Sequence, residues 1–138
     1  MKNVKVSLTA FVISLSFLFT QCSPEQVSTP STENLLIASP WKVHHFYQSQ
    51  DLTSHFGNVK LLFSNTGTVA VQKGNETVYG SWNRTFDSHA EMIHIHFNSA
   101  DPTVEMLRQS WKLVEKTNHS FRFEMTDPTI TTLGISKQ

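Results

Sequence analysis

The feature that most constrains the fold is a regular alternation of apolar and polar residues in short runs, each bounded by turn residues. The segments "SNTG", "KGNE", "DSHA" and "KTNH" separate runs such as "VKLLF" and "HIHF", and no run shows a helical period of useful length. Alternation with a period of two places one set of side chains on each face of a β-strand. Eight such runs, at a spacing of about 8 to 12 residues, predict an antiparallel meander.

The same alternation assigns an inward face to each predicted strand. Closing the meander into an eight-stranded barrel removes its exposed edges, but a two-sheet sandwich suits the pattern as well, so both architectures remain open. The inward positions, strand by strand, are Trp41, Val43, His45 and Tyr47; Val59, Leu61 and Phe63; Val69 and Val71; Val78, Gly80 and Trp82; Ile93, Ile95 and Phe97; Leu107, Gln109, Trp111 and Leu113; Phe121, Phe123 and Met125; and Leu133 and Ile135.

The connections give three further predictions. Gly67 in "SNTG" is expected to take a positive φ in a hairpin turn. Thr32 is expected to cap a short helical turn that ends before Pro40. The connection "NSADPTVE" is the longest of the later ones and has room for one more helical turn.

The N-terminal 21 residues have the composition of a secretory signal peptide. Lys2 and Lys5 precede an apolar run of 14 residues, which is shorter than the about 20 apolar residues that a spanning helix needs. Residues 22–31 are polar and contain two prolines, which is typical of a flexible tether. We therefore expect the remaining residues, 32–138, to form one folded domain with a modest core.

The only cysteine of the chain, Cys22, follows the apolar run directly. A lone cysteine cannot form an internal disulfide in an exported protein. The segment "LFTQC" resembles a bacterial lipoprotein lipobox, and this resemblance implies that Cys22 receives diacylglycerol and becomes the first residue of the mature chain. Ordinary signal-peptidase cleavage at "TQC" is the alternative. We expect an exported, lipid-anchored protein of the bacterial cell envelope, at the outer membrane.

Charge excludes one class of partner. Removal of residues 1–21 takes away Lys2 and Lys5 and no acid, which leaves 9 Lys and Arg against 11 Asp and Glu. The mature chain is thus slightly acidic and contains no run of basic residues. Nucleic acid is a poor candidate partner, and contact with the membrane is expected through the lipid.

Four motifs in a fixed order point to a family. The segments "LLIASPWKV", "LLFSNTGTVAV", "YGSWN" and "SWKLVE" are similar to those of small bacterial lipocalin-like domains, which are commonly lipoproteins. The resemblance covers residues 32–138. It implies a β-barrel that binds a small apolar or amphipathic ligand close to the membrane.

Inward aromatic and polar side chains are the candidates for ligand contact. Large aromatic rings either wall a pocket or fill the barrel interior, and inward polar groups either orient a ligand headgroup or lie at the barrel mouth. A filled barrel that docks a partner protein of the envelope is therefore the alternative function. The candidates are His45, Tyr47, Phe63, Trp82, Phe97, Gln109, Trp111 and Phe123.

Histidines offer the only hint of metal chemistry. His94 and His96 stand two apart on one predicted strand face, a spacing that can present two imidazoles to one zinc ion, but the adjacent strand positions supply no third donor. His44 and His45 are neighbours and are expected to point to opposite faces. The sequence contains no nucleophile elbow, phosphate loop or paired inward acids. We therefore expect neither a metal site nor another cofactor, and no enzyme activity.

Overall fold

The computed structural model describes residues 28–126 and 128–138. The predicted signal peptide and Cys22 lie outside these residues, so their assignments stay predictions. Within the described part, no helix combines the length and the apolar content needed to cross a membrane.

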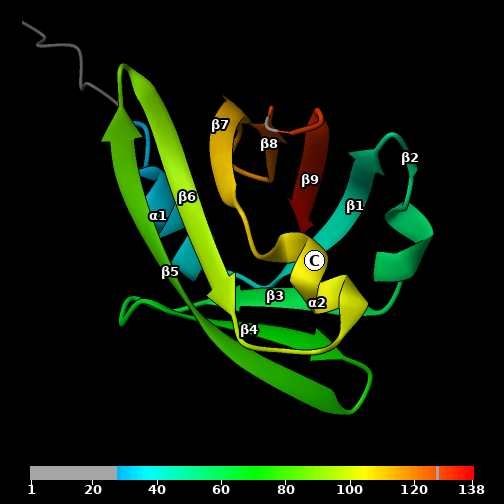
Figure 1. Ribbon diagram of the computed structural model, residues 1–138. Coiled ribbons are helices and arrows are strands. Elements are labelled where there is room, and N and C mark those ends of the chain that lie inside the picture. Colours follow the sequence, from blue (N-terminus) through cyan, green and yellow to red (C-terminus); the bar gives the residue numbers. More distant parts are fainter. Residues whose placement is uncertain (1–27, 127) are drawn as a thin grey trace, which may run out of the picture.

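Eight antiparallel strands close into an up-and-down β-barrel, which confirms the predicted fold class and excludes the sandwich. Consecutive strands are neighbours around the barrel, and β1 pairs with β9 at seven register positions, which closes it (Figure 1). The barrel strands are β1 (Trp41–Gln48), β3 (Val59–Phe63), β4 (Thr68–Lys73), β5 (Glu76–Asp87), β6 (Ala90–Phe97), β7 (Ser110–Lys116), β8 (Ser120–Met125) and β9 (Thr131–Lys137).

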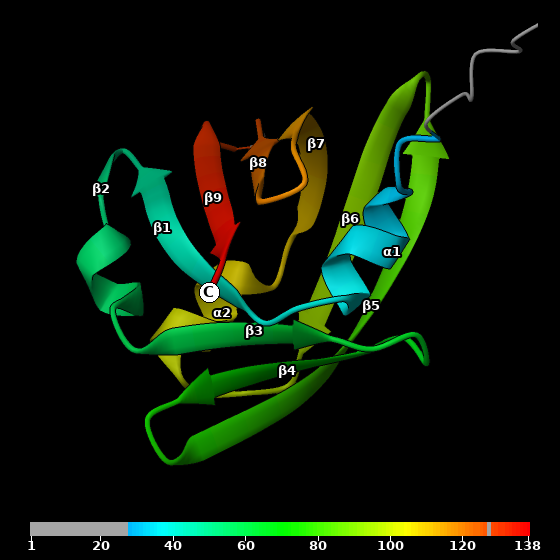
Figure 2. The ribbon, with the colours of Figure 1, turned by 180° about the vertical axis from the view of Figure 1, so that it is seen from behind.

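Two short helices lie at opposite ends of the barrel. α2 (Pro102–Leu107) is in front in Figure 1, and α1 (Thr32–Ile37) is in front in Figure 2, which shows the barrel from behind. Each helix is hydrogen-bonded to a fully buried tryptophan: Trp41 Nε1 donates to the Leu36 carbonyl at 2.8 Å, and Trp111 Nε1 donates to the Leu107 carbonyl at 3.1 Å. The two indoles therefore fix the helices to the barrel core.

The two predicted helical turns are confirmed, but the cap of the first is Ser31. The Ser31 hydroxyl accepts from the Asn34 amide at 3.1 Å, and Thr32 is already the first helical residue. An N-cap side chain reaches the amide two or three residues ahead, so the cap position sets where the first helical residue falls. The predicted start of this helix was thus one residue too late.

A β-bulge in β1 changes which of its side chains face the core. The pairing of β1 with β9 shifts between Val43 and His45, and an extra residue at such a point reverses the alternation beyond it. Phe46 is consequently buried, whereas Tyr47 is 42% exposed. The prediction that His45 and Tyr47 share the inward face with Val43 is therefore wrong.

A segment that the sequence did not predict lies between the first two barrel strands. It contains β2 (Gln50–Asp51), which folds back on the end of β1, and the 3-10 helix η1 (Thr53–Phe56). The Leu52 amide donates to the Phe46 carbonyl at 2.9 Å, and the Phe56 ring lies 4.8 Å from the Phe46 ring. This segment therefore covers the part of β1 that β3 leaves unpaired.

Packed aromatic side chains occupy the barrel interior. They meet mostly edge to face, as in the Trp41–Phe121 pair at 4.9 Å and the Phe63–Trp82 pair at 5.2 Å between ring centroids. The largest side chains that are almost completely buried are Trp41, Trp111, Phe46, Phe56, Phe97 and Phe121. The predicted inward positions of the strands after β1 form most of this core.

The predicted hairpin turn between β3 and β4 is confirmed. Gly67 has a φ of 80°, and its carbonyl accepts from the Trp82 amide at 2.9 Å. A Cβ at this position would lie 3.4 Å from the Trp82 carbonyl oxygen, in addition to the strain of a positive φ. The turn thus connects the first hairpin to β5.

Candidate functional site

The five aromatic candidates, Phe63, Trp82, Phe97, Trp111 and Phe123, all lie in the barrel core. Phe63 meets Trp82 edge to face, Trp111 lies against Phe46, and Phe123 stacks on Phe121. The Trp82 indole donates to the Ser64 carbonyl at 2.9 Å, and the Trp111 indole is bonded to α2 as described above. Both indole N–H groups thus have a partner within the protein, which is what a structural core requires.

The three polar candidates do not converge inside the barrel. His45 is half-buried and its Nε2 lies 2.9 Å from the Thr132 hydroxyl. The Tyr47 hydroxyl donates to the Ser49 carbonyl at 3.3 Å, near the end of β1. Gln109 lies between α2 and β7 and lines depressions on the outer surface. Binding of a ligand by this set stays a prediction, but these side chains do not form one interior polar group.

His94 and His96 lie on the outer face, as expected, with Asn83 and Ser110 directly opposite His94 on the flanking strands. Both line a depression of about 380 Å³ between β5, β6 and β7. The His94 ring is held on both sides, because Nε2 lies 2.7 Å from the Thr85 hydroxyl and Nδ1 lies 2.7 Å from the Ser110 hydroxyl. Among the described residues, no three His, Cys, Asp or Glu side chains are grouped as a metal site would require.

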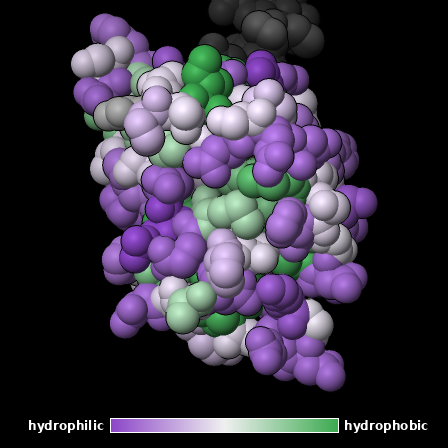
Figure 3. Space-filling model, turned by 45° about the vertical axis from the view of Figure 1, so that its right-hand side comes forward, coloured by the Kyte–Doolittle hydropathy of each residue, from purple (hydrophilic) through white to green (hydrophobic). Residues whose placement is uncertain are grey.

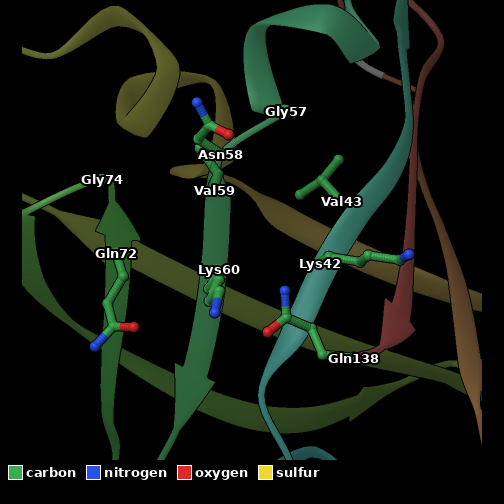
Figure 4. Close-up of a pocket in the computed structure, with 9 residues that line it drawn as sticks. All are labelled: Lys42, Val43, Gly57, Asn58, Val59, Lys60, Gln72, Gly74 and Gln138. Carbon is green, nitrogen blue, oxygen red and sulfur yellow. The ribbon is translucent and has the colours of Figure 1, made fainter.

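A different depression, of about 430 Å³, follows the junction between β1 and β3. Only two register pairs, Trp41 with Leu61 and Lys42 with Lys60, join these strands. Beyond them β1 bonds to the η1 segment instead, and Figure 4 shows the Val43 side chain in the space between the diverging strands. We call this junction, with its depression, the β1–β3 seam. Its lining residues are Lys42, Val43, Gly57, Asn58, Val59, Lys60, Gln72, Gly74 and Gln138.

The β1–β3 seam is polar at its rim and apolar at its floor. Val43 and Val59 are buried, whereas Lys42, Lys60 and Asn58 are exposed. Figure 3 shows one face of the molecule, on which hydrophilic residues predominate and hydrophobic ones form small areas between them. No carboxylate side chain lines the seam. The charged side chains of its lining are therefore Lys42 and Lys60.

Two histidines follow Lys42 along the outer face of β1 at the bulge. A Cβ built on Gly134 of β9 would lie 2.8 Å from His44 Nε2 and 3.0 Å from His45 Cβ, so both side chains lie beside Gly134 on the outside. The expectation that His44 and His45 point to opposite faces is wrong, because the bulge places them on the same face. Burial, followed by the charges of His45 and Lys42, lowers the pKa of His44.

Comparison with known proteins gives a match at the level of the fold. The barrel is similar to that of a DUF4847 family protein from Bacteroides vulgatus. The TM-score with this crystal structure is 0.56 at 13% identity, and the match covers 78% of this chain and 99% of that chain. No protein-family model matches the sequence, and no curated protein matches it. At this identity the likeness establishes the fold alone.

Sequence reasoning missed four residues that shape the seam: Lys42, Lys60, Phe46 and Phe56. The two lysines stand 18 positions apart, and their pairing depends on the length of the β2–η1 segment, which alternation does not indicate. Phe56 is an isolated aromatic residue in the polar segment "QSQDLTSHFG". Its isolation there was the available signal that this segment packs on the core. Phe46 was assigned to the outside because a bulge has no reliable signature in one sequence.

Proposed function

We propose that the protein is a lipid-anchored, lipocalin-like protein of the bacterial cell envelope whose barrel binds its partner or ligand through the outer surface. The observation that carries this proposal is the packing of aromatic side chains in the barrel interior, where a ligand of this family would be expected. Trp41, Phe97 and Trp111 are completely buried there. Depressions of several hundred cubic ångströms lie on the outside instead.

Support for the anchor comes from the sequence. Cys22 is the only cysteine, it follows an apolar run, and nine mostly polar residues separate it from α1. Two or more acyl chains, at about 0.8 kcal/mol per buried methylene, hold a protein stably on a bilayer. The tether brings the barrel close to the membrane surface without requiring a basic patch.

The anchor is tested with Cys22→Ser. We expect this variant to lose metabolic labelling by a palmitate analogue and either to become soluble or to accumulate as the precursor. Ser23→Ala is the matched control and should keep the label. Persistent labelling of Cys22→Ser would contradict the anchor, because the chain contains no second cysteine.

Binding through the outside is tested against binding in the interior. Trp41, Trp82 and Trp111 are at most 6% exposed, so a ligand that enters the core must disturb their fluorescence. We expect no saturable change with fatty acids, and no stoichiometric apolar molecule in an organic extract of the purified protein. The opposite results together would favour the ligand-binding function that the family resemblance implies.

A positive test places a photo-crosslinking amino acid on the surface of the full chain in cells. Lys60 in the seam and Tyr79, which is 70% exposed on β5, are suitable positions. We expect a discrete adduct from at least one of them, and we expect it to weaken when Cys22→Ser removes the protein from the membrane. The absence of adducts from both positions would contradict binding through these faces.

A further inference from the structure

We propose that the β1–β3 seam binds a phosphate monoester group, with Lys42 and Lys60 as its two cationic ligands. The inference rests on the proposed function only in placing the binding surface on the outside of the barrel. It names the site and the chemistry of its ligand, and it does not depend on the lipid anchor.

The first reason is that the two lysines are directly opposite one another across β1 and β3. Side chains in this relation have Cβ atoms about 4.5 to 5.5 Å apart, and like charges there are unfavourable. In Figure 4 the Lys42 and Lys60 side chains diverge, with the Gln138 carboxamide between them in this view. The flexible stems allow both ammonium groups to turn toward a shared anion.

The second reason is that Lys42 and Lys60 form no ion pair within the described residues, whereas Lys73 and the three described arginines do. In the described residues, neither Lys42 nor Lys60 takes part in an ion pair, and their other cross-strand neighbours, Ser136 and Gln72, are uncharged. Lys73 pairs with Asp101, Arg84 with Glu91, Arg108 with Glu105 and Arg122 with Glu115. Of the remaining lysines, Lys112 lies opposite Glu124 on the adjacent strand, Lys116 donates to the Pro30 carbonyl, and Lys137 lies over the Trp41 ring.

The third reason is the remaining lining of the seam. Asn58, Gln72 and Gln138 contribute carboxamides that can donate hydrogen bonds to anionic oxygens. Val43 and Val59 form an apolar floor next to them, which suits the alkyl part of an ester. A depression of about 430 Å³ has room for a headgroup of this kind.

The charge of the ligand follows from the number of cations. A phosphate monoester carries about −1.5 to −2 at pH 7, which matches two ammonium groups, whereas a carboxylate neutralises only one. Lysine is a common phosphate ligand, acting as a point charge. The site therefore fits a phosphate monoester better than a fatty acid.

The experiment uses the full mature chain with Cys22→Ser and follows backbone amide signals by NMR during titration with inorganic phosphate. We expect saturable shifts at Lys42, Asn58 and Lys60, and a smaller response to acetate. The double variant Lys42→Gln, Lys60→Gln should weaken phosphate binding at least about tenfold, from two ion pairs lost together. Lys112→Gln is the matched control, because Lys112 is also exposed on the outer face of a strand, and it should bind as the wild type does.

A second titration distinguishes the source of the phosphate. Vesicles of phosphatidylcholine with phosphatidic acid, compared with phosphatidylcholine alone, present the monoester in a bilayer. Binding of either probe that is lost in the double variant supports the site, and vesicle binding without response to free phosphate identifies a lipid headgroup as the source. Absence of both responses, or binding that the double variant and Lys112→Gln change equally, overturns the inference. If the double variant does not fold, each single variant should show a partial loss. The crosslinking and labelling tests of the proposed function are unaffected by a negative result.

Discussion

Two junctions of the barrel are built alike and differ in chemistry. β1 and β3 share two register pairs, and β6 and β7 share three, where most other neighbouring strands share five or more. In both places a short helix separates the strands in sequence, η1 in the first and α2 in the second. Phe56 from η1 and Leu107 from α2 are almost completely buried beneath these junctions.

Their polar residues behave differently. At the β6–β7 junction His94 is held between two hydroxyls and Arg108 is paired with Glu105 at 3.1 Å, so the polar groups satisfy one another. At the β1–β3 seam two lysines lie opposite one another, and no acidic side chain lines the depression. A local conflict without an evident structural gain is expected mainly at functional sites. The β6–β7 junction is therefore interpreted as structural, and the β1–β3 seam as the proposed binding site.

The largest expected effects concern what the junctions share. Phe56→Ala and Leu107→Ala each remove a buried side chain that fills the space beneath diverging strands, so each should lower the free energy of unfolding by about 2 to 5 kcal/mol. Urea denaturation measures both. Tyr79→Ala, at a side chain that is 70% exposed, is the control and should stay within about 0.5 kcal/mol. A small effect at either buried position would show that the two junctions are not filled in the same way.

The next effect concerns the attachment of α2. The Asp101 carboxylate accepts from the Thr103 amide at 2.8 Å and from Lys73 Nζ at 2.9 Å. Loss of an N-cap costs about 0.5 to 2 kcal/mol, so Asp101→Ala should destabilise the protein by roughly 1 kcal/mol or more. Thermal unfolding monitored by circular dichroism is the measurement. An unchanged midpoint would mean that α2 does not depend on its cap.

The same aspartate predicts a pH dependence. The hydrogen bond from Lys73 lowers the pKa of Asp101 most, and the Thr103 and Val104 amides add to this effect, against burial, which raises it. Because the folded pKa lies below the unfolded one, the stabilisation is present above the unfolded pKa and is lost as the pH falls through the folded one, below about pH 4. Asp101→Asn should therefore lose less stability between neutral pH and this range than the wild type does. Equal acid sensitivity of both proteins would contradict the assignment.

A smaller effect separates the two histidines of the β6–β7 junction. His94→Ala removes two side-chain hydrogen bonds and should lower the free energy of unfolding by about 0.5 to 1.5 kcal/mol. The His96 side chain is exposed and has no hydrogen-bond partner within the described residues, so His96→Ala should cost less than about 0.5 kcal/mol. Denaturation of the two single variants at pH 8 measures the difference. Equal costs would show that the Thr85 and Ser110 contacts contribute nothing.

Alternation predicted most of the barrel, because most of the inward positions that it assigned after β1 are buried. The predicted start of the sixth strand was wrong, because Leu107 ends α2 and β7 begins at Ser110. Alternation placed Phe63, Trp82 and Trp111 correctly, since a period of two leaves little choice of face in an unbroken strand. It failed at β1, where one inserted residue exchanged the roles of Phe46 and Tyr47. A bulge changes the face without changing composition, so the sequence could not indicate it.

The candidate site was less predictable than the fold. Lys42 and Lys60 each occupy an ordinary outward position, and nothing in their strands distinguishes them from Lys112. Their importance comes from the register between β1 and β3. The β2–η1 segment between these strands folds back on β1, where Phe56 lies against Phe46. Ion pairing likewise depends on which residues are neighbours across strands, and a single sequence does not indicate those neighbours.

The smallest expected effect sharpens the comparison most directly. Lys42→Gln removes one member of the opposed pair and should raise stability at low salt by about 0.2 to 1 kcal/mol, with the gain lost near 1 M salt, where the screening length is about 3 Å. It should also raise the pKa of His44, because Lys42 is one of the charges that lower it, after burial and His45. A lowered histidine pKa makes the fold less stable as the pH falls below the ordinary histidine value, so the variant should resist mild acid slightly better.

NMR titration of the His44 ring and denaturation at two salt concentrations measure the two effects. Lys112→Gln removes a cation that faces Glu124, and it should shift neither in the same direction. An unchanged His44 pKa with no gain at low salt would show that the Lys42–Lys60 repulsion is already relieved in the free protein, and the β1–β3 seam would then be as self-contained as the β6–β7 junction.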